Sequence, residues 1–260
     1  MRIVSEPLTF DADEPLPLTG ERTAPDIPDE RYWFVRHAVA YRWVLDRARD
    51  ARVLDAGCGE GYGAAMLAEP ARSVIACDLE SPVLARAQRR YPIAGVVGNL
   101  VSIPLRSRSL DLVVSMQTIE HLHSPVDFLA ECARILDPSG ALVVTTPNRL
   151  TFSPDGIVRN PFHTFEFAPS DLQAALERSF VVEQILGVFH GPKIRWWERR
   201  HRESITERLI RETVPAWSDT FRRFIHELDE DDFTISDASL DRSLDLVAVA
   251  RPRGDTAPVR

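Results

Sequence analysis

The sequence predicts an α/β fold, in which an open, mostly parallel sheet of seven strands is flanked by helices. Two observations favour it. Apolar, β-branched segments alternate along the chain with segments of helical spacing, which is typical of strand–helix–strand units. The first strand segment also ends in a cluster of glycines that leads into a helix. A chain of 260 residues is long enough to form one domain of this class.

The elements follow in order from the N-terminus. Residues 1–28 carry five prolines and several acids, which predicts an extended, partly mobile arm. The main domain is expected over 29–252, with a polar tail over 253–260, and a first helix begins near residue 29 because Pro28 suits a helix entry. Strands are predicted over 52–55, 73–78, 96–97, 110–116, 141–145, 180–189 and 244–250. Helices are predicted over 61–68, 81–91, 124–136 and 169–178, three of them opened by Ser-Pro or Pro-Ser pairs.

Residues 191–242 interrupt this alternation and are too long for a plain connection, so we expect a helical insertion or lid before the last strand. Near its start, Trp196 and Trp197 stand among arginines, which suits a surface that binds a sugar or an anionic group. The alternative is an amphipathic helix whose tryptophans belong to the core. The acidic run 227–232 is interpreted as a solvated loop.

Composition narrows the function classes. The net charge of −8 argues against nucleic acid as a partner. No apolar run approaches the ~18 residues of a membrane span, and the first residues have no signal-peptide core, so a cytoplasmic protein is expected. The three cysteines fall in no metal-binding spacing. A monomer and a homodimer are both compatible with the sequence.

The strongest motif is VLDAGCGEGYG over 53–63, where a strand enters a glycine-rich turn and then a helix. Glycines let a backbone turn sharply and approach a ligand closely, and Asp78 ends the next strand, where an acid accepts from ribose hydroxyls. A dinucleotide and S-adenosylmethionine compete for such a loop. The charge of Glu60 inside the loop is expected to repel a pyrophosphate, which favours the sulfonium cofactor.

This motif resembles the first motif of class I S-adenosylmethionine-dependent methyltransferases, which have a Rossmann-like fold. The resemblance implies that Asp55, Gly57 and Gly59 surround the methionine end of the cofactor. It implies further that Asp78 and Leu79 bind the ribose, Asn99 and Leu100 flank the adenine, and Gln117 lies near the methyl group.

Glu120 and His121 follow the fourth strand, where ligands of such sheets bind, and they are the first catalytic candidates. His163, in a later Pro-bearing loop, is a second candidate base. Glu120, His121 and His163 together are also able to hold a divalent cation such as Mg²⁺. Metal-dependent relatives carry another glutamate where this chain has Gln117, so the metal-free version is preferred. Asn148 and Arg149, after the fifth strand, are expected to contact the acceptor.

Three further segments narrow the resemblance: LTGERT over 18–23 with YWF and RH over 32–37; TFSP over 151–154 with NPFHT over 160–164; and FHGP over 189–192. With the core motifs, they resemble mycobacterial sugar O-methyltransferases of polymethylated polysaccharide biosynthesis. This implies an acceptor hydroxyl on a mannose- or glucose-type saccharide. The alternatives are a small metabolite such as a quinone precursor, and a non-catalytic module that binds the cofactor for regulation.

Overall fold

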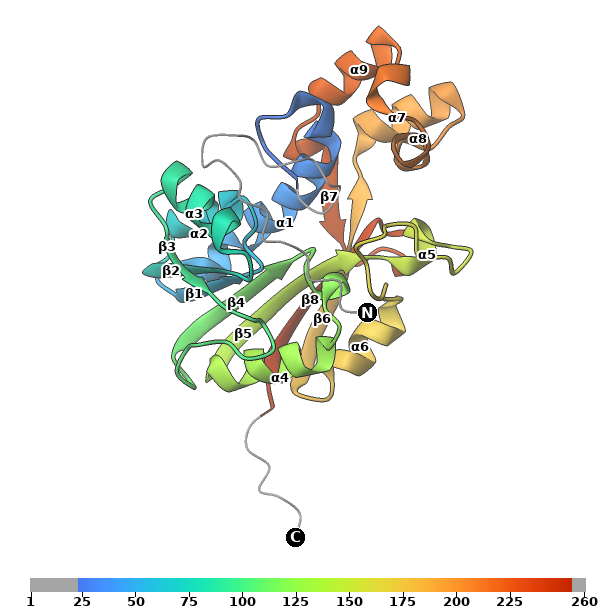
Figure 1. Cartoon of the computed structure of the whole chain (residues 1–260). Coiled ribbons are helices and arrows are strands. Elements are labelled where there is room, and N and C mark those ends of the chain that lie inside the picture. The colour runs from blue at the N-terminus through green and yellow to red at the C-terminus, as the bar shows by residue number, and fades with distance from the viewer. Residues whose placement is uncertain (1–22, 254–260) are drawn as a thin grey trace, which may run out of the picture.

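The computed structural model describes residues 23–253, so most of the expected arm (1–22) and tail (254–260) lie outside the described residues. One mixed sheet of eight strands runs through the described part, in the order β3-β2-β1-β4-β5-β8-β6-β7 (Figure 1). The strands are β1 (Arg52–Ala56), β2 (Ser73–Asp78), β3 (Ala94–Val97), β4 (Leu110–Met116), β5 (Leu136–Pro147), β6 (Phe180–His190), β7 (Phe233–Ser236) and β8 (Asp245–Pro252).

The sheet is mostly parallel, as expected, but it has antiparallel pairs at one side and one strand more than predicted. β1 pairs in parallel with β2 and β4, β2 with β3, and β4 with β5. β8 pairs antiparallel with both β5 and β6, and β6 antiparallel with β7. The expected seven strands were therefore wrong by one. β7 has only four residues and follows an acidic run, so its sequence carries too little alternation to mark a strand.

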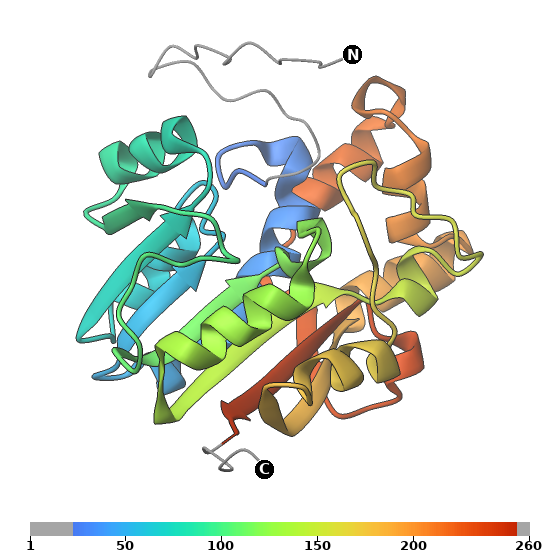
Figure 2. The same cartoon turned by 60° about the horizontal axis from the view of Figure 1, so that its bottom comes forward.

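Helices cover both faces of the sheet because consecutive strand residues point to opposite sides. In β1, Val53 belongs to the core beneath α1 (Arg31–Ala48), α2 (Tyr62–Ala68) and α3 (Ser81–Arg90). Its neighbour Leu54 belongs to the core beneath α4 (Pro125–Ile135) and α6 (Pro169–Leu176). Figure 2 shows these last two helices across the near face of the sheet. The predicted Rossmann-like layering is confirmed.

The segment 191–242 holds three α-helices besides β7: α7 (Pro192–His201), α8 (Ile205–Arg211) and α9 (Asp219–His226). In Figure 1 they lie above the sheet, on the side of β6 and β7. Trp197 stacks on His201 and on Phe224 in a core continuous with that under α1. The acidic run is not simply a solvated loop, because Asp232 is buried and accepts from Lys193 Nζ at 2.9 Å.

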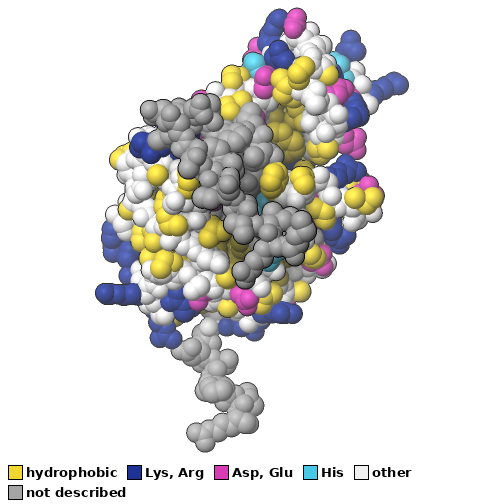
Figure 3. All heavy atoms as spheres, viewed as in Figure 1, with side chains coloured by type: hydrophobic (Ala, Val, Ile, Leu, Met, Phe, Trp, Pro, Cys, Tyr) yellow, Lys and Arg dark blue, Asp and Glu magenta, His cyan; other side chains and the backbone are white. Residues whose placement is uncertain are grey.

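Short helices complete the chain. They are η1 (Pro28–Glu30), η2 (Ile119–His121), α5 (Arg149–Phe152), η3 (Val214–Ala216), η4 (Glu230–Asp232) and η5 (Leu240–Arg242). On the face in Figure 3, lysine and arginine side chains are spread around the rim and do not gather into one basic field. Within residues 23–253, no helix has the length and apolar character that a membrane crossing requires.

Candidate active site

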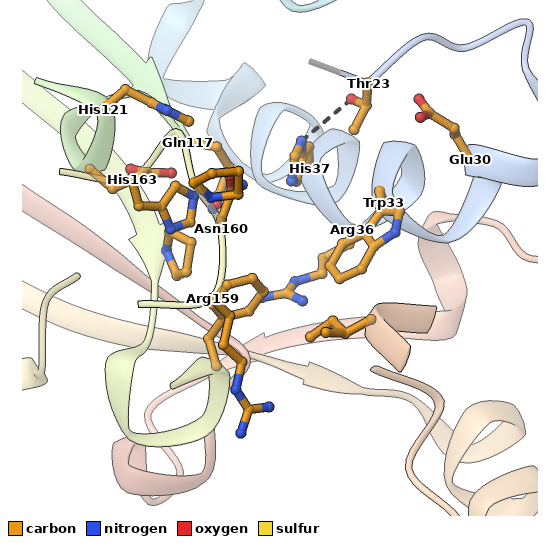
Figure 4. A pocket seen from close by; sticks show the side chains of 15 residues that line it. Thr23, Glu30, Trp33, Arg36, His37, Gln117, His121, Arg159, Asn160 and His163 are labelled. Carbon is orange, nitrogen blue, oxygen red and sulfur yellow. Dashed lines mark hydrogen bonds between the residues drawn. The ribbon is translucent and has the colours of Figure 1, made fainter. Parts of the chain in front are cut away.

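A cavity of about 280 Å³ opens beyond the carboxyl ends of β4 and β5, where open α/β sheets bind ligands. Figure 4 shows its two sides. One side comes from α1, and the opposite side from the segment after β4 and from the loop 159–163. Its principal polar and aromatic lining residues are Trp33, Arg36, His37, Gln117, Glu120, His121, Arg159, Asn160 and His163.

The glycine loop after β1 borders the expected cofactor site. Gly57 has φ +84°, and a Cβ there would lie 2.4 Å from the Thr118 side chain, so glycine is required. Gly59 has φ +48°, and a Cβ there would meet nothing within 4 Å. The Gly59 amide donates to Asp78 Oδ2 at 3.0 Å. The loop backbone therefore faces open space beside an acid, which suits a ligand that approaches closely.

Asp55, at the base of this loop, is fully buried. Its Oδ1 accepts from the Tyr41 hydroxyl at 3.0 Å, whereas no hydrogen-bond partner for Oδ2 is found among the described residues. Burial raises the pKa of this carboxyl to about 7. An unpartnered buried carboxylate oxygen is costly unless a ligand supplies a donor or a positive charge. The amino group and sulfonium of S-adenosylmethionine fit that requirement.

The other expected cofactor residues flank the same edge of the sheet. Asp78 accepts two backbone amides, from Gly59 and from Glu80. Leu79 is 66% exposed at the end of β2. Asn99 is exposed and accepts from the Val101 amide, and its neighbour Leu100 is buried. Gln117 lies apart from them and lines the cavity, and its φ of +52° turns the chain at the end of β4.

Glu60 was expected to repel a pyrophosphate, and its surroundings contradict this. Glu60 is buried, and its Oε2 lies 3.2 Å from Arg86 Nε. Because the guanidinium compensates the carboxylate, Glu60 presents no bare charge that would repel a pyrophosphate. The loop itself and Asp55 carry the cofactor assignment instead.

The structure brings together the three residues expected at the reaction centre. One ligand atom each from Glu120, His121 and His163 lies within 4.8 Å of the other two. The connection is made by the loop 160–166, because the amide and the hydroxyl of Thr164 both donate to the Glu120 carbonyl, at 2.8 and 3.0 Å. Residues more than forty positions apart thus share one wall of the cavity.

Each member of this cluster is held from behind. His121 Nδ1 donates to the Phe162 carbonyl at 3.1 Å, and His163 Nδ1 lies 2.9 Å from Glu166 Oε1. Glu120 is 1% exposed, Thr146 donates to its Oε2 at 3.0 Å, and burial raises its pKa to about 8. Histidines fixed at one nitrogen by a carbonyl or carboxylate are oriented as general bases and metal ligands commonly are.

The α1 side of the cavity was not expected from the sequence. Trp33, Arg36 and His37 were part of the resemblance, but no role was inferred for them. Arg36 is buried and donates from Nε and Nη2 to the two carboxylate oxygens of Asp245, at 2.7 and 2.5 Å. Burial lowers the pKa of His37 to about 4; the charge of Asp245 opposes this shift, and the weaker effect of the Arg36 charge adds to it. The spacing of these three residues, which places them on one face of a helix, was the signal in the sequence that could have identified this wall.

The four residues expected to bind the acceptor do not line the cavity. Asn148 is fully buried, and its side chain caps α5 and donates to the Leu240 and Ser243 carbonyls. Arg149 points to Asp171 at 3.3 Å. Trp197 is 4% exposed and belongs to the core, which was the stated alternative, and Trp196 is 60% exposed outside the cavity. The burial of Asn148 and Trp197 argues against their expected role as acceptor contacts, and Arg149 and Trp196 lie outside the cavity, whose lining includes Trp33 and Phe152 instead.

Comparisons with known proteins identify the family. The family described as "Methyltransferase domain" matches residues 54–144. Two relatives are named "probable S-adenosylmethionine-dependent methyltransferase". The one from Mycolicibacterium smegmatis is 44% identical over 243 residues, covering 90% of this chain and 95% of the relative. The one from Mycobacterium tuberculosis is 43% identical, covering 90% and 89%.

A solved S-adenosylmethionine-dependent methyltransferase from Mesorhizobium loti has a TM-score of 0.55 at 19% identity, covering 83% of this chain and 97% of its own, and thereby shows the same fold. The similarity to the mycobacterial relatives extends over nearly the whole chain. The chain belongs to the class I S-adenosylmethionine-dependent methyltransferases.

Proposed function

We propose that the enzyme methylates a hydroxyl group of a neutral saccharide of glucose or mannose type. The observation that carries this proposal is the lining of the cavity, where the Trp33 indole stands opposite the hydrogen-bonding side chains of Gln117, Asn160 and His163. Phe152 and Ile210 add apolar contacts. An aromatic face packs against the C–H face of a pyranose, while the amide and imidazole groups engage its hydroxyls. The resemblance to mycobacterial sugar O-methyltransferases supports the same acceptor class.

Bound S-adenosylmethionine supplies a methyl group on a positively charged sulfur. The protein must hold an acceptor oxygen in line with that methyl. It must also accept the proton that the hydroxyl loses, or stabilise the negative charge that develops on its oxygen. The cluster of Glu120, His121 and His163 lies on the same cavity wall as Gln117, which follows the strand next to the glycine loop. It is the group of side chains placed to accept that proton.

The geometry of the cluster also supports a divalent cation, although Gln117, in place of a glutamate, argued against one from the sequence. A buried carboxylate and two imidazoles, each imidazole held at Nδ1, form a donor set that suits Mn²⁺ or Zn²⁺ better than Mg²⁺, which prefers oxygen ligands. A cation held by these three residues would lower the pKa of an acceptor hydroxyl.

Chelation tests the cation. With EDTA present, turnover should fall below detection, and Mg²⁺ or Mn²⁺ should restore it. Glu120→Gln should then cost as much as His163→Ala, because a hard cation needs the carboxylate charge. Full activity in EDTA would indicate metal-free base catalysis by the cluster. Removing the histidine that acts as the base should then lower turnover by ~10²–10⁴-fold.

A quinone precursor or another small metabolite is the competing acceptor class. Such a ring system favours a pocket with few polar groups. Pro147, Phe152, Pro161 and Ile210 give this cavity apolar walls, but Arg36, Arg159, Asn160 and three histidines add more hydrogen-bonding groups than such an acceptor would use. The alternative of a non-catalytic regulatory module is disfavoured, because the relatives that match nearly the whole chain are named as enzymes.

The acceptor class is tested by release of S-adenosylhomocysteine with a panel of mannosides, glucosides and dihydroxybenzoates. We expect turnover with a sugar, and we expect Trp33→Leu to raise its KM by about tenfold, since such aromatic contacts contribute roughly 1 kcal/mol or more. The matched control is Trp43→Leu on the same helix, outside the cavity, which should leave KM unchanged. Turnover with the aromatic acceptors alone would contradict the proposal.

A further inference from the structure

The reaction cavity continues into a second, smaller pocket of about 90 Å³. Four residues line both: Arg36, Phe152, Arg159 and Ile210. The walls that belong to the second pocket alone include Thr151 at α5 and three residues at the start of α8, namely Ser204, Thr206 and Glu207. A ligand that fills the reaction cavity is therefore able to extend toward the helical insertion.

A buried donor stands at the junction of the two pockets. Arg36 is 3% exposed, and Asp245 and the Leu244 carbonyl take up its Nε and Nη2. Within residues 23–253, Nη1 has no hydrogen-bond partner. The Tyr32 hydroxyl interacts with this guanidinium and also with His190 Nε2 at 2.7 Å and Thr206 Oγ1 at 2.6 Å, so it can satisfy at most one of the two N–H groups of Nη1. A buried N–H without an acceptor is costly, and an oxygen of a bound ligand would satisfy it.

The charges around the second pocket identify the kind of ligand. Arg36 is paired with Asp245, and Arg159 lies 3.7 Å from Asp155. Glu207 adds a carboxylate to the wall, so the pocket has no excess of positive charge. A phosphate or carboxylate group is disfavoured here, because it would be repelled by Glu207 and would find no cation among the described lining residues that is not already paired with an acid. Hydroxyl, carboxylate and guanidinium groups together suit a neutral ligand that both donates and accepts hydrogen bonds.

We infer that the acceptor spans two subsites: the unit that is methylated lies in the larger cavity, and the edge of an adjacent neutral sugar residue enters the second pocket, where it accepts from Arg36 Nη1. This inference rests on the proposed saccharide acceptor. It makes the enzyme selective for an oligosaccharide over a single sugar ring, because only the longer acceptor uses the contacts at α8.

The test compares a one-ring acceptor, a methyl mannoside or glucoside, with the corresponding α-linked disaccharide. Two or so additional hydrogen bonds should give the disaccharide a kcat/KM about tenfold higher or more. Glu207→Trp narrows the second pocket and should reduce this ratio to about one. Asp219→Trp is the matched control: it also replaces an exposed acid in the first turn of an insertion helix, but lines neither pocket, and should keep the wild-type ratio.

Each outcome decides one question. Equal use of both acceptors by the wild type, or an unchanged ratio in Glu207→Trp, would overturn the second subsite and leave the proposed function standing. Turnover of neither sugar by the wild type would reject the saccharide acceptor itself, and the second subsite with it. Thermal melting of both tryptophan variants shows that each comparison is made on folded enzyme.

Discussion

At the scale of single residues, the site contains polar groups that are buried with fewer partners than they are able to bind. Asp55 keeps one carboxylate oxygen without a donor, and Arg36 keeps one N–H group without an acceptor. The first lies at the glycine loop and the second between the two pockets. Such groups reduce stability in the free protein, and a ligand that completes them gains affinity.

Asp55→Asn should separate these two effects. The folded-state pKa of about 7 lies above the ordinary value of 3.8, so the folded protein holds a proton that the unfolded chain has lost. This contribution to stability is complete below about pH 4 and disappears as pH rises through 7. Between pH 5 and 8 the wild type should lose about 2–3 kcal/mol from this group, and the variant should not.

Urea denaturation without cofactor at the two pH values measures the difference, and Asp46→Asn, at an exposed position, serves as the control. Calorimetry on the same Asp55 variant should show weaker binding of S-adenosylmethionine. Parallel stability curves for wild type and Asp55→Asn would mean that the carboxyl is already ionised in the folded protein.

Asp78→Ala is expected to weaken cofactor binding by ~1–3 kcal/mol, the cost of losing a charge-assisted hydrogen bond. Asp78 holds the Gly59 amide as well, so the loop should become less ordered. Calorimetry with S-adenosylmethionine provides the measurement, and unchanged affinity in a folded variant would remove Asp78 from the cofactor site.

At the scale of elements, α1 is a structural helix and a wall of the cavity at once. The buried pair of Arg36 and Asp245 ties it to the first residue of β8. Tyr32, one turn earlier, connects it to β6 and α8 through His190 and Thr206. The periodicity of the sequence predicted this helix, but no local pattern shows which strand an arginine will meet two hundred residues later.

Asp245→Ala should cost ~3–5 kcal/mol of unfolding free energy, because it leaves the buried guanidinium of Arg36 without its counter-charge. The comparison is Asp231→Ala, which removes an exposed ion pair with Arg42 and should cost less than about 1 kcal/mol. Denaturant titrations of the two variants are directly comparable. Equal losses would show that α1 is held mainly by its apolar face.

At the scale of the whole molecule, the sequence was sufficient where local chemistry determines the structure. The glycine loop, the parallel strands β1 to β5 and the helices α3 and α4, which begin at Ser-Pro pairs, carry their signals in a few adjacent residues. The wall of Trp33, Arg36 and His37 and the short strand β7 depend on long-range packing, so the sequence did not reveal them. For the same reason Trp197, expected beside an acceptor, lies in the core of the insertion.

The most direct test of the account is to follow the methyl group itself. The enzyme is incubated with Mg²⁺, a mannose- or glucose-type disaccharide and S-adenosylmethionine labelled with carbon-13 in its methyl group, and the product is examined by NMR. We expect the label to appear as a methoxy group on one sugar carbon, in equal amount to the S-adenosylhomocysteine released. A label that appears on a non-sugar acceptor instead, or remains in S-adenosylmethionine with every sugar tried, would contradict this expectation.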